Sequence, residues 1–390
     1  MPRINPALAA IEEPPIPQAH AWGARYDGRL GPLLDMCQAV PGYKPNADLL
    51  RHAAVAAGDD ASARYGLIPG DPALREAYAA ELNATYGANV TIDQVAITAG
   101  CNQAFFAAML VLAAAGDNVL LPVPWFWNHQ QTCAMLGIEP RPVPCRADRG
   151  FVPDPDDAAR RMDARTRALV LITPNNPTGA VYPPDIIARF AALCGDRGIV
   201  LVLDETYRDF LPRGENRAHA LFLDPAWPAH LLQLYSFSKA YCVPGFRVGA
   251  LTGDAGLVSE AVKALDCLHI CPQRASQAAL AWAIPALRDW RADNRETMNG
   301  RADAVRAGFQ RLADWRVESL GAYFAYVRHP FADRSSAQAA EYLAAELGAM
   351  GLPGGAFGPG QDGHVRLAFA NVTADGIADL VGRLAQQTRM

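Results

Sequence analysis

One lysine is the residue whose type and setting in this sequence best suit covalent chemistry. Only three of the 35 basic residues are lysine, namely Lys44, Lys239 and Lys263, so the chain makes nearly all of its positive charge with arginine. Lys239 lies among apolar and hydroxyl side chains in the stretch 236–249 rather than on a charged face. A desolvated lysine can lose its proton and attack a carbonyl carbon, which arginine cannot do because it stays protonated. A surface lysine without a chemical role is the alternative interpretation.

Polar residues follow a series of short apolar runs at the points where those runs end. The polar segments are 98–102, 124–126, 175–179, 204–207 and 236–239. Together they supply a glycine turn before a helix, an aromatic ring, an amide, a carboxylate with a phenol, and hydroxyls beside an amine. A helix N-terminus after Gly100, with Ser236, Ser238 and Arg247 nearby, could bind a phosphate. Taken singly, each of these residues also has a purely structural explanation, such as a helix start, a cap or a turn.

The apolar runs themselves predict the sheet that would bring these segments together. Runs of Val, Ile and Leu separated by helices are typical of parallel strands covered on both faces. The expected strands are 95–98, 118–122, 168–173, 199–203 and 231–235, with helices that include 46–57, 72–86 and 184–194. We therefore predict an α/β fold with a mostly parallel, doubly wound sheet in a large domain over 46–284. In such sheets ligands bind beyond the carboxyl ends of the strands.

The rest of the chain predicts a second domain and an arm. After residue 254 long helices are expected, and shorter strands mixed with helices follow, which indicates a smaller α+β domain over 31–45 and 285–390. Residues 1–30 are rich in proline, and we expect an irregular N-terminal arm that lies over another surface and reaches a partner subunit.

Several of these motifs, in this order and spacing, resemble the class I/II aminotransferases. The resemblance rests on 175–179, 204–207 and 236–249, in which Lys239 and Arg247 are eight residues apart. It extends from about Tyr43 to the C-terminus and includes 353–358 and the triplet 365–367. It implies an aspartate aminotransferase-like fold, that of the fold type I enzymes, which use pyridoxal 5′-phosphate (PLP). It also implies that the chain is a PLP-dependent aminotransferase.

The resemblance implies roles around the ring of the cofactor. Lys239 would hold PLP as an internal aldimine and, once released, move the proton between the substrate Cα and C4′ as general base and acid. Asp204 would pair with the pyridine nitrogen and favour its protonated form. Asn176 and Tyr207 would hydrogen-bond the ring 3-oxygen. Phe126 would stack on the ring, with a neighbouring tryptophan on either side as the alternative.

The resemblance also implies which residues hold the phosphate and the substrate. The phosphate would lie among Gly100, Cys101, Asn102, Ser236, Ser238 and Arg247, with Tyr65 reaching it from the partner subunit. The last of these contacts implies a homodimer with shared active sites. Arg366 would bind the substrate α-carboxylate through two hydrogen bonds, close to Ala39 and Asn176.

The sequence departs from the family's common pattern near the substrate. Ala39 stands where many relatives carry a glycine, which predicts a tighter pocket, and Cys101 and Asn102 replace the usual hydroxyl or small residues. Over 264–274, Arg274 is the only candidate to pair with a substrate side-chain carboxylate. We therefore expect a neutral, aromatic or basic L-amino acid as donor, rather than aspartate, and a 2-oxo acid as acceptor.

Composition favours a small-molecule partner in the cytoplasm. The net charge is −5 and the pI is near 5.9, with both signs scattered, so we expect no nucleic-acid partner. No segment suits a signal peptide or a membrane span. The eight cysteines lie singly in apolar surroundings, which indicates reduced, buried thiols. The pair Cys267 and Cys271 lacks the second pair of a zinc site, so no metal site is expected.

Other functions are compatible with parts of the sequence. The segment 236–239 fits the S-x-x-K motif of serine β-lactamases and penicillin-binding proteins, but their K-T-G motif is missing. A PLP-binding regulator would need a DNA-binding module, for which the N-terminal arm is too short. C–S β-lyases and amino-acid-oxidising or cyclising enzymes of the same fold share Lys239, Asp204 and Arg366, so these stay open. We favour transamination because it is the commonest activity of the resembling family.

Overall fold

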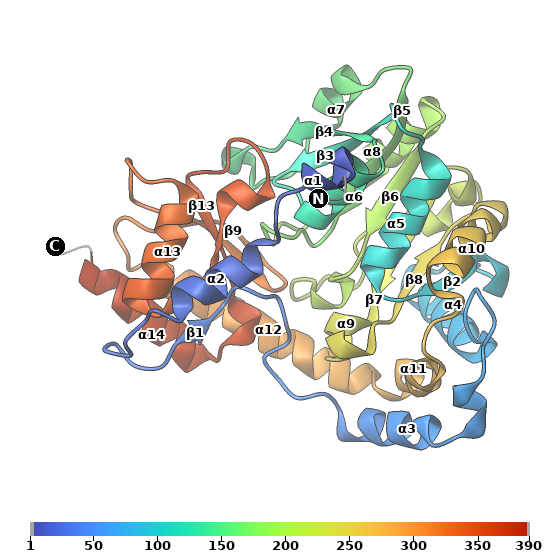
Figure 1. The fold of residues 1–390 in the computed structure, drawn as a ribbon, viewed down its shortest axis with the longest axis horizontal. Helices are drawn as coiled ribbons and strands as arrows, with labels where there is room; N and C mark the ends of the chain where they lie inside the picture. Colours follow the sequence, from blue (N-terminus) through green and yellow to red (C-terminus); the bar gives the residue numbers. More distant parts are fainter. Residues whose placement is uncertain (1–3, 388–390) are drawn as a thin grey trace.

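Two separate sheets organise the chain in the computed structural model, which describes residues 4–387. Figure 1 shows the larger sheet on one side of the molecule and the smaller sheet on the other, with α12 (Arg288–Phe309) running between them. The predicted class, a mostly parallel sheet joined to a smaller α+β part, is confirmed. The predicted domain boundaries at 45/46 and 284/285 stay a prediction.

The larger sheet has seven strands in the order β2-β8-β7-β6-β5-β3-β4. Its strands are β2 (Val95–Thr98), β3 (Asn118–Val123), β4 (Glu139–Pro144), β5 (Thr166–Ile172), β6 (Val200–Asp204), β7 (Leu231–Ser236) and β8 (Gly249–Thr252). β7, β6, β5, β3 and β4 pair in parallel, and β8 is antiparallel to both of its neighbours. The register sets Asp204 opposite Ile172 on one side and Leu234 on the other. The ends of β5, β6 and β7 therefore meet at one edge.

Helices cover both faces of this sheet. Leu201 and Leu203 belong to a core with α4 (Pro72–Tyr86), α8 (Pro184–Asp196) and α11 (Arg274–Ala286). Val202, between them, belongs to a second core with α5 (Cys101–Leu112), α6 (Trp127–Met135) and α10 (Ala255–His269). Successive side chains of a strand point to opposite faces, so an unbroken apolar strand must be covered twice. The remaining helices around this sheet are α3 (Ala47–Ala57), α7 (Pro155–Arg161) and α9 (Phe237–Ala240).

Two strands of the larger sheet escaped the sequence analysis. β4 carries prolines at alternate positions, which argue against a strand in a sheet interior, yet β4 lies at the edge and pairs only with β3. Proline is tolerated there because half of the backbone N–H groups of an edge strand need no partner in the sheet. β8 is four residues long and reverses direction, so it lacks the strand-helix-strand pattern that revealed the others.

The smaller sheet has four strands in the order β12-β13-β10-β9. They are β9 (Arg316–Gly321), β10 (Phe324–Arg328), β12 (Leu352–Pro353) and β13 (His364–Ala368), all antiparallel. A separate two-stranded pair joins β1 (Leu34–Asp35) to β11 (Ala349–Met350). One core contains side chains from this sheet, α12, α13 (Ser336–Leu347) and α14 (Ala374–Gln387). Chain before residue 46 therefore joins the C-terminal part.

The N-terminal segment is helical, and the expectation of an irregular arm is wrong. It forms α1 (Pro6–Ala9) and α2 (Pro15–Gly23), each with proline in its first turn. Proline suits that position because its missing N–H is not needed there. Ala19 is buried, and a Cβ at Gly23 would lie 2.4 Å from the Met350 sulfur, so α2 packs closely on the smaller part of the molecule. Figure 1 shows α2 crossing in front of α13 and β1.

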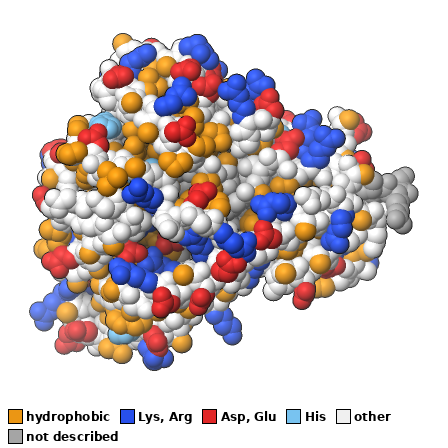
Figure 2. Space-filling view, turned by 180° about the vertical axis from the view of Figure 1, so that it is seen from behind, with side chains coloured by type: hydrophobic (Ala, Val, Ile, Leu, Met, Phe, Trp, Pro, Cys, Tyr) orange, Lys and Arg blue, Asp and Glu red, His pale blue; other side chains and the backbone are white. Residues whose placement is uncertain are grey.

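The surface carries charges of both signs. Figure 2 shows lysine and arginine side chains interspersed with aspartate and glutamate on one face. Across residues 4–387, no helix is long and apolar enough to cross a membrane. All eight cysteines are free thiols, but Cys267 is exposed, so the expectation of burial is wrong for that residue.

Candidate active site

A cavity of about 540 Å³ lies at the carboxyl ends of β5, β6 and β7. Twelve of the residues predicted for the site line it: Ala39, Cys101, Asn102, Phe126, Asn176, Asp204, Tyr207, Ser236, Ser238, Lys239, Arg247 and Arg366. Gly100 lies against the Arg247 guanidinium beside the cavity. Tyr65 does not line it and is 80% exposed.

Lys239 lies at the cavity in the short helix α9, which follows β7 directly. Its ammonium group donates a hydrogen bond to the backbone carbonyl of Ala39. Burial, together with the positive charges of Arg366 and Arg247, lowers the pKa of Lys239 to about 8. A substantial fraction of this amine is therefore neutral in mildly alkaline solution, as an amine that attacks a carbonyl must be.

Asp204 is the last residue of β6, and its side chain is buried. His129 Nε2 lies 3.4 Å from Oδ2, and the backbone N–H of Thr206 donates to Oδ1 at 2.9 Å. Burial works to raise the pKa of Asp204, but the hydrogen bonds and charge of His129 and the hydrogen bonds of Thr206 outweigh it and lower that pKa. Asp204 is therefore an ionised carboxylate beside the cavity, suited to stabilise a protonated ring nitrogen.

His129 is a site residue that the sequence analysis missed. It lies on α6, stacked on Phe105 with ring centroids 3.9 Å apart, and it meets the ring of Phe126 edge-on. The signal available was its spacing: His129 follows Phe126 by three residues, which places both on one side of a helix start. Its contact with Asp204 makes it a positioning residue for that carboxylate.

The phosphate corner has the features of an anion site. Gly100 has φ +84° and precedes α5, and a Cβ there would lie 2.2 Å from Arg247 Nη2. Only glycine therefore allows the guanidinium to approach the first turn of α5, where backbone N–H groups are unpaired. The Ser238 hydroxyl is buried without a hydrogen-bond partner. A buried polar group without a partner is costly, so these donors fit a bound phosphate.

Arg366 lies on β13 and is almost completely buried. Its Nη1 donates to Asn176 Oδ1 at 2.9 Å, and its Nη2 donates to the backbone carbonyl of Cys37. The Nε group has no partner, and burial lowers the pKa of Arg366 to about 10. A buried cation with unused donor capacity at a cavity is suited to bind a carboxylate.

The aromatic residues of the site differ in where they lie. Phe126 and Trp127 line the cavity, whereas Trp125 packs against the glycine loop at Gly358. The Trp127 ring lies 5.6 Å from the Arg366 guanidinium carbon. Trp125 therefore lies outside the cavity, and the stacking position on the ring stays a prediction for Phe126, with Trp127 as the alternative.

The fold, with a half-buried lysine, a buried carboxylate and an anion corner at the sheet edge, defines a PLP-dependent enzyme of fold type I. Residues 33–384 match the family described as aminotransferase class I and II, and the chain belongs to that family. It is similar to an aspartate/prephenate aminotransferase of Thermus thermophilus, with 30% identity over 85% of this chain and 86% of the relative. An aromatic aminotransferase of Arabidopsis thaliana is 27% identical over 87% of this chain and 85% of its own length. The solved aspartate aminotransferase from Thermus thermophilus with maleate superposes with a TM-score of 0.90 at 26% identity, covering 99% of this chain and 100% of that one.

The low pKa of Lys239 predicts selective reactivity. In the apoenzyme, acylation of Lys239 by an amine-selective reagent should reach half its maximal rate near pH 8, because the neutral amine is the reactive form. An unperturbed lysine titrates near pH ~10.4. The exposed Lys44 and Lys263 are internal controls, read from the same peptide maps. Equal pH profiles for the three lysines would contradict the prediction.

The position of Asp204 predicts a large effect of Asp204→Asn. The neutral amide cannot stabilise a protonated ring nitrogen, so turnover should fall at least ~100-fold while PLP stays bound. Turnover and cofactor content measured on the same preparation test this. Asp254→Asn is the matched control, because Asp254 caps α10 and asparagine caps equally well. Wild-type turnover in Asp204→Asn would exclude the assigned role.

Proposed function

We propose that this protein moves the amino group of a neutral, aromatic or basic L-amino acid to a 2-oxo acid. The observation that carries the proposal is the convergence of Lys239, Asp204 and Arg366 on one cavity. These are the amine, the carboxylate and the carboxylate-binding cation that the reaction requires. When bound, the cofactor supplies the electron sink that makes the substrate Cα–H bond acidic.

Each residue of the cavity would have a separate role in this reaction. Lys239 would hold the cofactor through its ε-amino group and, once released, would take and return the proton of the substrate Cα. Asp204 would stabilise a protonated ring nitrogen of the cofactor, with His129 fixing the orientation of the carboxylate. Arg366 orients the substrate through its carboxylate so that the Cα–H bond faces Lys239. Asn176 Oδ1 accepts a hydrogen bond from Arg366, so the amide N–H groups of Asn176 would be available to the ring oxygen or the substrate.

The proposed class of amino-acid donor rests on the side chains that line the cavity. Besides Phe126 and Trp127, the cavity is lined by Ile16, Val40 and Ile172, all apolar. Arg274, the arginine considered for a side-chain carboxylate, lies elsewhere, with its Nε 3.3 Å from both carboxylate oxygens of Asp71. An apolar surface rewards an apolar or aromatic side chain and penalises an unpaired carboxylate.

We also propose a homodimer in the cytoplasm in which Tyr65 reaches the partner's phosphate site. Tyr65 is 80%, Leu67 55%, Leu268 45% and Ile270 37% exposed, which is unusual for large apolar side chains that lie close together, here in one loop and at the C-terminal end of α10. The two segments are joined by a hydrogen bond from the Gly66 N–H to Cys271 Sγ. Burial against a second copy explains this exposure. The free cysteines suit a reducing compartment.

An amino-acid panel tests transamination against elimination. Holoenzyme mixed with single amino acids, without any 2-oxo acid, should convert stoichiometrically to the pyridoxamine form, fastest with neutral or aromatic donors. The visible spectrum and the released 2-oxo acid measure this. Continuous release of ammonia or pyruvate without an acceptor would establish a lyase or oxidase instead. Aspartate as the best donor would refute the proposed donor class but leave transamination intact.

The carboxylate role of Arg366 predicts the outcome of Arg366→Lys. Lysine keeps the charge but loses the paired N–H donors, so kcat/KM should fall about 10- to 100-fold, which corresponds to ~1.5–3 kcal/mol for a charged hydrogen bond. Steady-state kinetics with the best donor measure the change. Arg328→Lys on the neighbouring strand β10 is the control, because Arg328 is exposed and outside the cavity. A smaller effect in Arg366→Lys than in the control would overturn the assignment.

A further inference from the structure

Three metal-ligating side chains meet outside the catalytic cavity, where α2 crosses the segment after β1. His20 belongs to α2, and Asp35 and Cys37 lie on the adjoining segment at the end of β1. One donor atom of each lies within 4.8 Å of the others. Cys37 Sγ is 3.8 Å from His20 Nε2 and 3.0 Å from Asp35 Oδ1.

The Cys37–His20 separation of 3.8 Å suits a tetrahedral zinc ion, and the Cys37–Asp35 contact of 3.0 Å must widen slightly when the metal binds. Zinc bonds of ~2.0–2.3 Å at tetrahedral angles place neighbouring ligand atoms about 3.3–3.8 Å apart. Asp35 is the last residue of β1 and Cys37 follows at a bend, which brings the two side chains together. Hydrogen bonding alone accounts for the contact of Asp35 with Cys37, since Asp35 Oδ1 accepts from the Cys37 N–H and thiol. It does not account for the imidazole that completes the group.

We propose that His20, Asp35 and Cys37 bind a zinc-like divalent cation that fastens helix α2 to the segment bordering the active site. On binding, the Cys37 thiol gives its proton to solvent and the thiolate sulfur bonds the metal, with water as the fourth ligand. The cation itself offsets the repulsion between the two anionic ligands.

The site is connected to the catalytic cavity on both of its sides. His20 follows Ile16 by four residues on α2, so both side chains lie on one face of the helix, and Ile16 lines the cavity. The backbone carbonyl of Cys37 accepts a hydrogen bond from Arg366, and Ala39, two residues on, accepts from Lys239. A metal bound by His20 and Cys37 would therefore hold α2 against the segment 37–39, whose carbonyl groups accept hydrogen bonds from Arg366 and Lys239.

No metal site was expected from the sequence, because the pair Cys267 and Cys271 lacks a second pair. The three ligands are separated by 15 and 2 residues and include a single cysteine, so no zinc motif appears in the sequence. Only the packing of α2, which was expected to be irregular, brings His20 to the other two. The three ligands are therefore recognised only from the tertiary structure.

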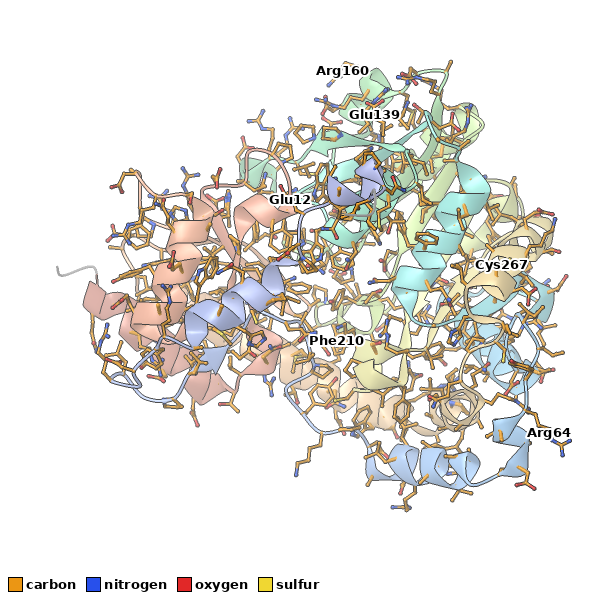
Figure 3. The ribbon with its side chains drawn as sticks, in the orientation of Figure 1. Glu12, Arg64, Glu139, Arg160, Phe210 and Cys267 are labelled. Carbon is orange, nitrogen blue, oxygen red and sulfur yellow. The ribbon has the colours of Figure 1, made fainter. Side chains whose placement is uncertain are left out.

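Zinc binding by chelator-treated holoenzyme tests the proposal. Competition of Zn²⁺ with a chromophoric chelator should give one ion per chain for the wild type and at least ~10-fold weaker binding for His20→Gln and Cys37→Ser. His20 is exposed, so His20→Gln is expected to fold and to keep its basal activity. Cys267→Ser is the matched control, because Cys267 lies on α10, across the molecule from α2 (Figure 3). Its affinity should equal that of the wild type.

Hydrogen exchange then tests the fastening of α2. Zinc should slow exchange of the amides of residues 15–23 in the wild type and leave them unchanged in His20→Gln, with α10 as an internal reference. Wild-type affinity in His20→Gln and Cys37→Ser, absence of zinc binding, or loss of binding in Cys267→Ser alone would each overturn the site. Stoichiometric binding without slower exchange in α2 would overturn the fastening. None of these readouts depends on transamination, so failure here is distinct from failure of the proposed function.

Discussion

The rest of the site depends on the burial of the Asp204 carboxylate at the end of β6. Removing a carboxylate from water costs several kcal/mol unless hydrogen bonds and an opposite charge replace the lost hydration. His129 from α6 and the N–H of Thr206 supply that replacement, so the loop after β6 and helix α6 must both be in place. Cys101 adds a weak thiol contact 3.6 Å from Oδ2. The result is a fixed negative charge, which under the proposed function would meet a cationic ring without reorganisation.

Desolvation also acts on Lys239, where it lowers the pKa, whereas it works to raise the pKa of Asp204. Burying an amine favours its neutral form, and the guanidinium groups of Arg366 and Arg247 reinforce this. Positive neighbours lower the pKa of both groups, and a lowered pKa keeps a carboxylate ionised but lets an amine lose its proton. Arg366 comes from the smaller sheet and Lys239 from the end of the larger one. The pKa of the lysine therefore depends on how the two parts of the molecule pack.

What the sequence predicts follows the rules of strand ends. Asp204, Asn176 and Lys239 were predicted because each follows an apolar run, and such ends must converge in a parallel sheet. His129 was missed because it lies inside a helix, where only tertiary packing decides which side chain faces a strand end. The prolines of β4 argued against a strand and those of α1 and α2 argued against helices, for the same reason. Their meaning depends on whether the chain is at an edge or in a first helical turn, which local sequence does not show.

The proposed donor class rests on how few cations border the cavity. Within the described chain, its cationic lining residues are Lys239, Arg247 and Arg366, and the proposed function assigns each of them to the cofactor or the α-carboxylate. A donor with a second carboxylate would leave that group against Ile16 and Trp127 or would need a cation from a second copy. Ala39 also lines the cavity and accepts a hydrogen bond from Lys239 through its carbonyl, and the tighter pocket expected from its methyl group stays a prediction. Within one chain, the cavity thus favours a side chain whose binding comes from apolar contact.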